Sequence, residues 1–260
     1  KGGRLAAACA PARVVSLIVS DVPGDDPAQV ASGPTVPDTV DARAALGMIS
    51  AWRIELPGRI LDHIRSPASA APMPDDACFA RNEVHVVASA RLSLEAAART
   101  AEAEGIPAAI LSDSIEGEAR DVGLVHAAVA REVAARGRPF TPPVVLLSGG
   151  ETTVTLRGDG GKGGRNTEFL LAFAHAIDGI DGIHALSADT DGIDGTEDNA
   201  GAFADGTVAA ALRAGGEDAM TLLGRNAAWE AFDRVGALFV PGPTGTNVND
   251  FRAILIRSMD

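Results

Sequence analysis

The chain has 260 residues, 46% of them hydrophobic, and a formal net charge of −13. This length and apolar content suit one large domain or two of ordinary size. The negative charge argues against a nucleic-acid partner, because such proteins present a basic face. The two cysteines form no pattern that predicts a disulfide scaffold or a structural zinc site. The longest apolar run near the start, residues 14–19, is far too short to span a bilayer.

The first half of the sequence alternates short apolar segments with segments of helical spacing. Strands are predicted at residues 14–20, 83–89 and 108–111. Helices are predicted at residues 40–65, with a break at Pro57-Gly58, and at residues 92–104 and 117–135. Strand–helix–strand order favours parallel pairing, so we predict a layered α/β fold.

A segment rich in proline and glycine, residues 136–143, predicts a linker between two domains. We therefore expect domains at residues 1–141 and 142–260. In the second domain, strands are expected at residues 144–148, 151–157, 183–188 and 251–256, with a turn at Gly149-Gly150. Helices are expected there at residues 166–177, 205–214 and 226–235.

Five glycines stand among the seven residues 158–164, directly before Arg165 and Asn166. Glycine lets a ligand approach the backbone closely, and the N-terminus of a helix offers unpaired N–H groups to phosphates and carboxylates. Arg165 adds a planar cation that suits the same anions. The segment therefore predicts an anion site, and a flexible loop before a helix remains the alternative.

The glycine loop satisfies one nucleotide-binding pattern and fails another. Gly158, Gly160 and Gly163 satisfy G-x-G-x-x-G, the dinucleotide fingerprint. However, the segment before the loop is too polar for a central Rossmann strand, and the helix is expected later than the fingerprint requires. The Walker A pattern fails because Lys162 is followed by a glycine.

Two further polar loops carry candidate site residues. Residues 189–199, DTDGIDGTEDN, follow a predicted strand, where α/β proteins place their sites, and crowded carboxylates there predict a Mg²⁺ site or a catalytic base. A solvated acidic turn is the alternative. Residues 242–250, GPTGTNVND, offer small neutral donors suited to hydroxyls and carboxylates, although a tight connection before the last strand would explain them equally well.

Four segments resemble a known family: SDVPGDDPAQVASGPTVPD, LSGGETTVTLRGDGGKGGRNTEF, ADTDGIDGTEDNAGAFADG and GPTGTNVNDFRAIL. They are similar to the class II glycerate 2-kinases, whose carboxyl-terminal domain is called MOFRL. The resemblance implies a cytoplasmic protein that transfers the γ-phosphoryl group of ATP to the 2-hydroxyl of D-glycerate, with Mg²⁺. It also implies two layered α/β domains with the site in the cleft between them.

The family extends upstream of residue 1, so the resemblance implies an amino-terminally truncated member. Its first domain would be Rossmann-like and incomplete. The family's lysine lies in the upstream segment, which this sequence does not contain.

The resemblance also assigns roles to individual residues. The family's active-site arginine, aspartate and asparagine match Arg165, Asp191 and Asn247. Arg165 would hold a carboxylate or phosphoryl group together with the loop glycines, Gly160, Gly161, Gly163 and Gly164. Asp191 would accept or orient the proton of the 2-hydroxyl, and Asp189 would help to hold Mg²⁺. Asn247 and Thr246 would fix the substrate's hydroxyls.

Two other functions remain open at this stage. One is an NAD(P)H-dependent hydroxypyruvate reductase that uses the loop glycines for its cofactor. The other is a non-catalytic fragment of the kinase. The expected partners are glycerate and a nucleotide, with no nucleic acid and no membrane, and the resemblance allows a homodimer.

Overall fold

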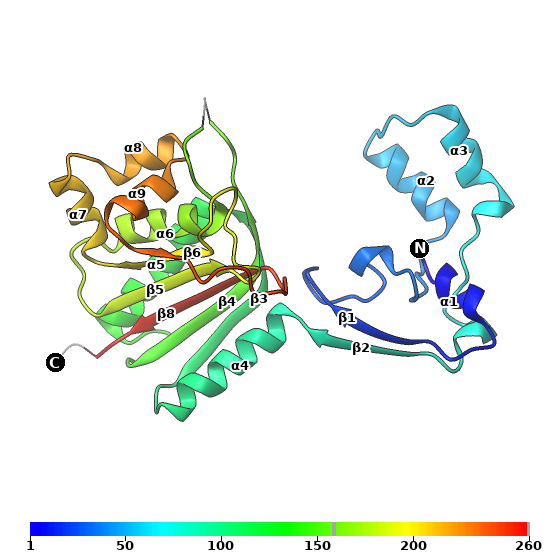
Figure 1. The fold of residues 1–260 in the computed structure, drawn as a ribbon, viewed down its shortest axis with the longest axis horizontal. Helices are drawn as coiled ribbons and strands as arrows, with labels where there is room; N and C mark the ends of the chain where they lie inside the picture. Colours follow the sequence, from blue (N-terminus) through cyan, green and yellow to red (C-terminus); the bar gives the residue numbers. More distant parts are fainter. Residues whose placement is uncertain (158–159, 259–260) are drawn as a thin grey trace. The chain divides into compact units, whose positions relative to one another are not determined.

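The computed structural model describes residues 1–157 and 160–258. The chain divides into two compact units, Lys1–Val87 and Ala88–Asp260 (Figure 1). Each unit contains strands and helices, so the structure confirms the predicted α/β fold class. In the part of the chain that the structure describes, no helix is both long enough and apolar enough to cross a membrane.

The first unit contains two paired strands, β1 (Val15–Val19) and β2 (Glu83–Ala88), which confirm both strand predictions for this region. Its helices are α1 (Arg4–Cys9), α2 (Ala42–Ala51) and α3 (Gly58–Arg65), and its 3-10 helices are η1 (Val30–Ser32), η2 (Pro67–Ser69) and η3 (Ala77–Phe79). The side chain of Asp41 caps α2 by accepting a hydrogen bond of 2.7 Å from the N–H of Ala44. The predicted break at Pro57-Gly58 is confirmed, because α3 begins at Gly58.

The second unit contains one six-stranded sheet in the order β3-β4-β8-β5-β6-β7. The strands are β3 (Ala108–Glu118), β4 (Val144–Thr153), β5 (Ile183–Asp189), β6 (Gly201–Asp205), β7 (Leu238–Phe239) and β8 (Asp250–Ile256). The parallel pairing predicted from chain order holds for β3 and β4, but β8 runs antiparallel to both β4 and β5. The sheet is therefore mixed, with the last strand of the chain near its centre.

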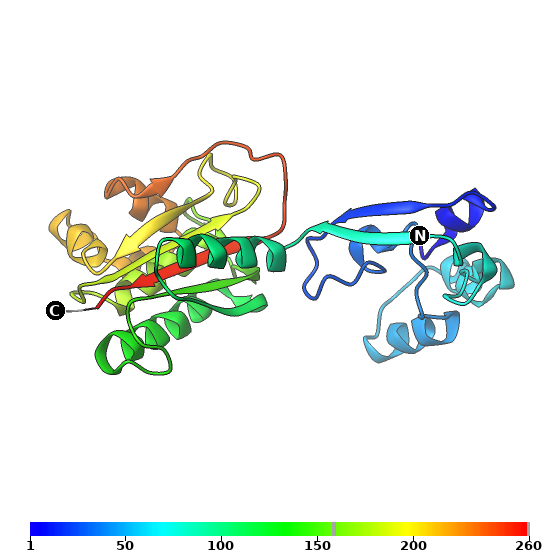
Figure 2. The same cartoon turned by 90° about the horizontal axis from the view of Figure 1, so that it is seen from below.

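The helices of the second unit cover both faces of this sheet (Figures 1 and 2). They are α4 (Ala90–Ala103), α5 (Ala119–Arg136), α6 (Arg165–Ala176), α7 (Val208–Ala214), α8 (Ala219–Gly224) and α9 (Ala228–Arg234). Helix α6 packs against α5, β5 and β6, and the side chains of Phe169 and Phe173 on α6 are fully buried. Helix α4 contacts β3, β4 and β8. The sequence did not predict α1, α8, β6 or β7.

The predicted turn at Gly149-Gly150 is wrong, because β4 continues through both glycines as far as Thr153. Gly150 has a φ of +125°, and a Cβ there would collide with the backbone of Ile115 on β3. Glycine is therefore required by the close approach of the neighbouring strand, where the β3–β4 register is irregular. The predicted strand at residues 151–157 supplies only the last three residues of β4.

The domain boundary predicted after residue 141 lies inside the second compact unit. Strand β3 pairs with β4 from Ala108 opposite Val145 onward, and α5 packs on α6. Backbone pairing and helix packing thus join the residues before and after the segment 136–143. The compact unit begins at Ala88, and the division at 141/142 remains a prediction about the family's domains.

Candidate active site

The candidate site lies at one edge of the sheet of the second unit, where β4 and β5 end and β8 begins. The antiparallel register places Asp250 opposite both Gly150 and Asp189. Glu151 follows Gly150 directly, so three carboxylates come from three neighbouring strands. Helix α6 begins with Arg165 at the same edge. The side chain of Arg165 therefore reaches all three carboxylates.

Each nitrogen of the Arg165 guanidinium contacts a different carboxylate. Nε is 2.8 Å from Oδ1 of Asp250, Nη2 is 2.5 Å from Oδ2 of Asp189, and Nη1 is 2.9 Å from Oε1 of Glu151. Burial alone would lower the pKa of Arg165, but the charges of Asp250 and Asp189 outweigh burial and raise the pKa above its usual value. Arg165 is therefore a permanent cation in this site.

Asp250 lies between two arginines. Its Oδ2 accepts a hydrogen bond of 2.5 Å from Nη2 of Arg252, and it also accepts bonds of 3.2 Å from the N–H and from the hydroxyl of Thr152. Its Oδ1 accepts a bond of 2.8 Å from Nδ2 of Asn166. Burial lowers the pKa of Arg252, and the negative charge of Asp250 opposes this effect. Asp250 and Arg252 were not predicted to belong to the site, although charged residues at alternate positions of a buried strand are a visible signal in the sequence.

The N-terminus of α6 is capped by Asp194, a member of the acidic segment. The Asp194 carboxylate accepts hydrogen bonds of 2.9 Å from the backbone N–H of Asn166, from the backbone N–H of Thr167 and from the Thr167 hydroxyl. Burial raises the pKa of Asp194 to about 6, although these donors lower it. Two of the N–H groups that would attract an anion to a helix N-terminus are thus already bonded within the protein.

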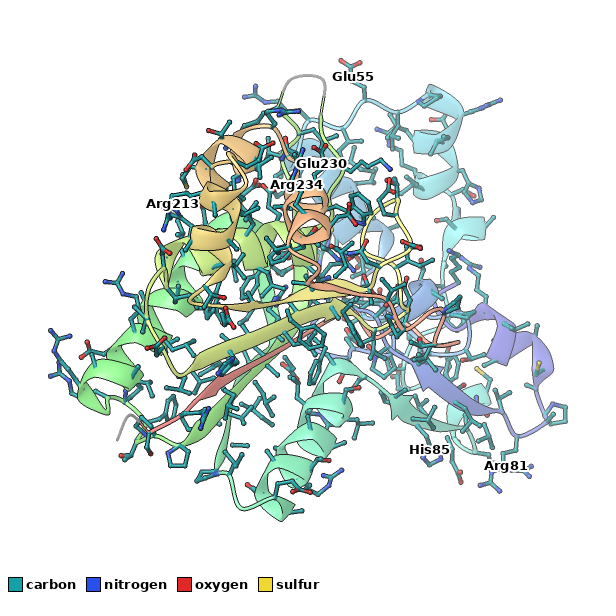
Figure 3. All side chains as sticks on the ribbon, turned by 60° about the vertical axis from the view of Figure 1, so that its left-hand side comes forward. Glu55, Arg81, His85, Arg213, Glu230 and Arg234 are labelled. Atoms are coloured by element: carbon teal, nitrogen blue, oxygen red, sulfur yellow. The ribbon has the colours of Figure 1, made fainter. Side chains whose placement is uncertain are left out.

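Two glycines of the loop before α6 pack against α9 and the segment before it. A Cβ at Gly161 would lie 2.5 Å from the Cβ of Ala227, and a Cβ at Gly163 would lie 2.9 Å from the carbonyl oxygen of Asn226. The backbone of the intervening Lys162 bonds to α9, where its carbonyl accepts from the N–H of Trp229 at 3.0 Å. Helix α9 also carries Glu230 and Arg234, which Figure 3 labels.

The other loop glycines differ from one another. A Cβ at Gly164 would lie less than 3.0 Å from the carboxyl carbon and the carbonyl oxygen of Asp194. Gly160 has a φ of +67°, and a Cβ there would meet no described atom within 4 Å. Gly158, the first glycine of the dinucleotide pattern, lies outside the described residues. Three of the four candidate glycines are therefore required by close contacts with the protein's own chain.

A cavity of about 450 Å³ opens beside Arg165. Its lining combines apolar side chains, polar side chains and loop glycines: Val154, Leu156, Ile193, Thr152, Arg165, Glu168, Asp189, Asn226, Gly161, Gly163, Gly164 and Gly195. All of these residues belong to the second unit. The volume falls within the range of about 300–1,000 Å³ that is usual for small-molecule sites.

The acidic segment and the loop before β8 are bonded to each other. The hydroxyl of Thr190 donates to the carbonyl of Asn249 at 2.8 Å, and the hydroxyl of Thr244 donates to the carbonyl of Thr190 at 2.5 Å. These bonds hold the loops that carry Asp191 and Asn247 next to each other.

Four predicted site residues stand outside the cavity lining: Gly160, Asp191, Thr246 and Asn247. Asp191 accepts from the N–H of Ile193 at 2.8 Å, and Asn247 accepts from the N–H of Asn249 at 2.9 Å. Thr246 lines a second cavity, of about 350 Å³, to which Asp189 also contributes. Of the predicted site residues, those that line the first cavity are Arg165, Asp189, Gly161, Gly163 and Gly164.

The fit of Mg²⁺ to Asp189 is limited in this structure. Oδ2 of Asp189 bonds to Arg165, and Oδ1 accepts from the N–H of Asp191 at 3.2 Å. Burial raises the pKa of Asp189, although these partners lower it. Within residues 1–157 and 160–258, no three His, Cys, Asp or Glu side chains gather in an arrangement that could hold a metal ion. The described residues therefore provide no cage of protein ligands for Mg²⁺.

Comparisons with known proteins identify the family. The MOFRL family model matches residues 144–250, and a domain of unknown function, DUF4147, matches residues 1–65. A glycerate kinase of Macaca fascicularis is 34% identical to this chain, over 99% of the chain and 76% of the relative. The chain belongs to the glycerate kinase family. The family's MOFRL segment contains β4, Arg165, Asp189 and the first residue of β8, and hence the whole edge that forms the candidate site.

Two other relatives bear on fold and function. A crystal structure of glycerate kinase from Thermotoga maritima is similar to this chain with a TM-score of 0.88 and 39% identity, over 98% of this chain and 60% of that one. A putative hydroxypyruvate reductase of Agrobacterium vitis is 47% identical, over 98% of this chain and 66% of the relative. The chain thus spans less than two thirds of the length of both proteins.

Proposed function

We propose that the protein is a glycerate 2-kinase, which transfers the γ-phosphoryl group of ATP to the 2-hydroxyl of D-glycerate and releases 2-phosphoglycerate. The observation that carries this proposal is the position of Arg165. It is the first residue of α6 and lines the cavity together with Asp189. Arg165 matches the family's active-site arginine, and Asp189 lies two residues before Asp191, which matches the family's aspartate. The family membership of the chain supports the same reaction class.

Phosphoryl transfer needs positioning and charge neutralisation more than covalent help from the protein. Arg165 would supply the fixed positive charge, facing either the carboxylate of glycerate or the phosphoryl group in transfer. Asp191 would accept or orient the proton of the 2-hydroxyl, and Asn247 and Thr246 would bind the substrate's hydroxyls from the neighbouring loop. This division of roles is a prediction from the family motifs.

We also propose that Mg²⁺ enters the site with ATP. Mg²⁺ usually takes one or two carboxylates together with substrate phosphates, rather than a complete set of protein ligands. Asp189 and Asp191 are the two candidate carboxylates, and the ion would supply neutralisation of phosphate charge. A rise in melting temperature with millimolar Mg²⁺ and ATP together, but not with Mg²⁺ alone, is the expected result.

The second candidate function is the NAD(P)H-dependent reduction of hydroxypyruvate, which the name of the Agrobacterium vitis relative favours. The structure of the glycine loop opposes it. Helix α6 begins two residues after Gly163, and the N–H groups of Asn166 and Thr167 already bond to Asp194. A cofactor pyrophosphate would therefore not find the open helix end that the dinucleotide fingerprint supplies.

One pair of assays separates the candidate functions. The full-length protein is supplied with D-glycerate and MgATP, and 2-phosphoglycerate is measured; in parallel, it is supplied with hydroxypyruvate and NADH or NADPH, and cofactor oxidation is measured. We expect turnover only in the first assay. Turnover only in the second would replace the kinase by the reductase, and turnover in neither would favour a non-catalytic ligand-binding role. We further propose a cytoplasmic location and a homodimer, the latter to be tested by light scattering.

A further inference from the structure

The surroundings of Arg165 present a charge problem for an enzyme that binds anions. Three carboxylates contact this arginine, and among the described residues one other cation, Arg252, contacts the cluster through Asp250. The cluster therefore carries one more negative than positive charge. A carboxylate or phosphate that approaches Arg165 would meet net repulsion, although two of the five guanidinium N–H groups lie outside these three contacts. Departure of one carboxylate would remove the excess negative charge and free a further donor for an anion.

Burial decides which carboxylate can leave. The side chain of Asp250 is 0% exposed and that of Asp189 is 6% exposed, whereas that of Glu151 is 46% exposed. Asp250 is also fixed by Thr152, Asn166 and Arg252, as described above. Breaking a buried ion pair leaves an unpaired charge without water and is strongly destabilising, whereas an exposed ion pair contributes little to stability. Glu151 is therefore the one partner that can be exchanged at small cost.

We propose that Glu151 is a displaceable carboxylate, which occupies Nη1 of Arg165 until the carboxylate or phosphoryl group of a substrate takes its place. Asp250 and Asp189 keep the guanidinium in position meanwhile, through Nε and Nη2. Glu151 would thus set the affinity of the site for anions, and it would keep Arg165 paired when no substrate is bound. This inference rests on the proposed anion-binding role of Arg165.

The chain offers a matched control for the charge of Glu151. Glu116 on β3 stands directly opposite Glu151 in the β3–β4 register, and it is exposed. Among the described residues, Glu116 makes no bond to Arg165. Glu116→Gln and Glu151→Gln therefore remove the same charge from neighbouring positions, but only the second removes a charge that is paired with the arginine.

The test is anion binding by isothermal titration calorimetry at low salt. D-glycerate, MgATP and inorganic phosphate are titrated separately into the wild type, Glu151→Gln and Glu116→Gln. For the probe that binds at Arg165, we expect Glu151→Gln to lower Kd by about three- to tenfold, and Glu116→Gln to change it by less than about twofold. The gain should shrink as salt is raised, because exposed charges are screened. Comparison of the glycerate and MgATP titrations identifies which substrate replaces Glu151.

A second measurement shows whether the effect acts through Arg165. In an Arg165→Ala background, the additional change Glu151→Gln should leave Kd unaltered, because the guanidinium for which Glu151 and the anion compete is absent. Weaker or unchanged binding in the single variant Glu151→Gln, with a normal melting temperature, would overturn the proposal and make Glu151 a permanent support of the arginine. Binding of no probe by either protein would also overturn it. Tighter phosphate binding without any kinase turnover would instead uphold the proposal and reject the proposed function.

Discussion

Replacing Gly164 with alanine tests whether the glycine loop serves the protein's own packing. Gly164 has extended backbone, with a φ of −150°, so alanine meets no conformational penalty there. Its new methyl group would, however, collide with the carboxyl group and the carbonyl of Asp194. Asp194 would have to move away from the end of α6 that it caps. Gly160→Ala is the matched control, because a Cβ at Gly160 would meet no atom of the described residues within 4 Å, although its φ of +67° is left-handed.

The two variants should differ in free energy of unfolding. Overpacking costs about 1–3 kcal/mol, and partial loss of a helix cap costs about 0.5–2 kcal/mol, so Gly164→Ala should lose about 2–4 kcal/mol. For a unit of this size, such a loss lowers the melting temperature by roughly 5–15 °C. Gly160→Ala should lose only about 1 kcal/mol, from backbone strain.

Urea unfolding measures this difference. The chain has two tryptophans, and replacing the exposed Trp52 of the first unit with phenylalanine leaves Trp229 on α9 to report on the second unit. We expect a lower midpoint for Gly164→Ala at an unchanged slope. Equal midpoints, or a lower one for Gly160→Ala, would show that Gly164 is not required for packing on Asp194. The glycines of the loop would then be explained by ligand binding alone.

Three further predictions concern Arg165, Asp191 and His126. Arg165→Ala should lower kcat/KM for glycerate phosphorylation at least about a hundredfold, and Arg165→Lys should also fail because it lacks a two-pronged fork; near-normal kinetics would remove the arginine from the site. Asp191→Asn should fold normally and lose most turnover, whereas full activity would make Asp191 a solvated acid. Burial lowers the pKa of His126 from about 6.5 to about 4, so this histidine alone should remove about 3 kcal/mol of stability as pH falls from 6.5 to 4. Asp194, whose pKa burial raises to about 6, acts in the opposite direction over this range, so the wild type is compared with His126→Gln at each pH. In urea titrations the wild type should lose stability relative to His126→Gln as pH falls, and a constant difference would place the titration elsewhere.

The elements that local pattern determines could be predicted from the sequence. Strands β1, β2 and β5 and helix α6 follow from short apolar runs and from helical spacing, and the structure confirms them within a few residues. The proximity of Arg165 to Asp189 could also be predicted in part. Arg165 begins a helix and Asp189 ends a strand of the same unit, and α/β proteins place their sites at such ends.

Features that depend on long-range pairing could not be predicted. Asp250 and Arg252 acquire their role only because β8 lies between β4 and β5, and no local signal specifies that order. The same limit applies to the loop glycines. A sequence shows that a side chain is absent, but only the fold shows that Asp194 or Ala227, rather than a ligand, occupies the space at Gly164 or Gly161.

Asp194 illustrates a second limit. Within the acidic segment it looks like Asp189 and Asp191, and all three could be metal ligands or bases by composition. In the structure Asp194 caps α6, Asp189 pairs with Arg165, and Asp191 accepts a bond from within its own loop. The three carboxylates differ in their burial and in their distance from the N-terminus of α6, and neither property can be read from the composition of the segment.

The central position of β8 has a consequence for the order in which the protein matures. Until the ribosome has released residues 250–256, β4 and β5 have no strand between them, and each leaves a row of backbone groups unpaired. The same insertion delivers Asp250, the buried partner of Arg165. Assembly of the sheet and assembly of the anion site are therefore a single late event, and a nascent chain without β8 should neither bind substrate nor resist proteolysis.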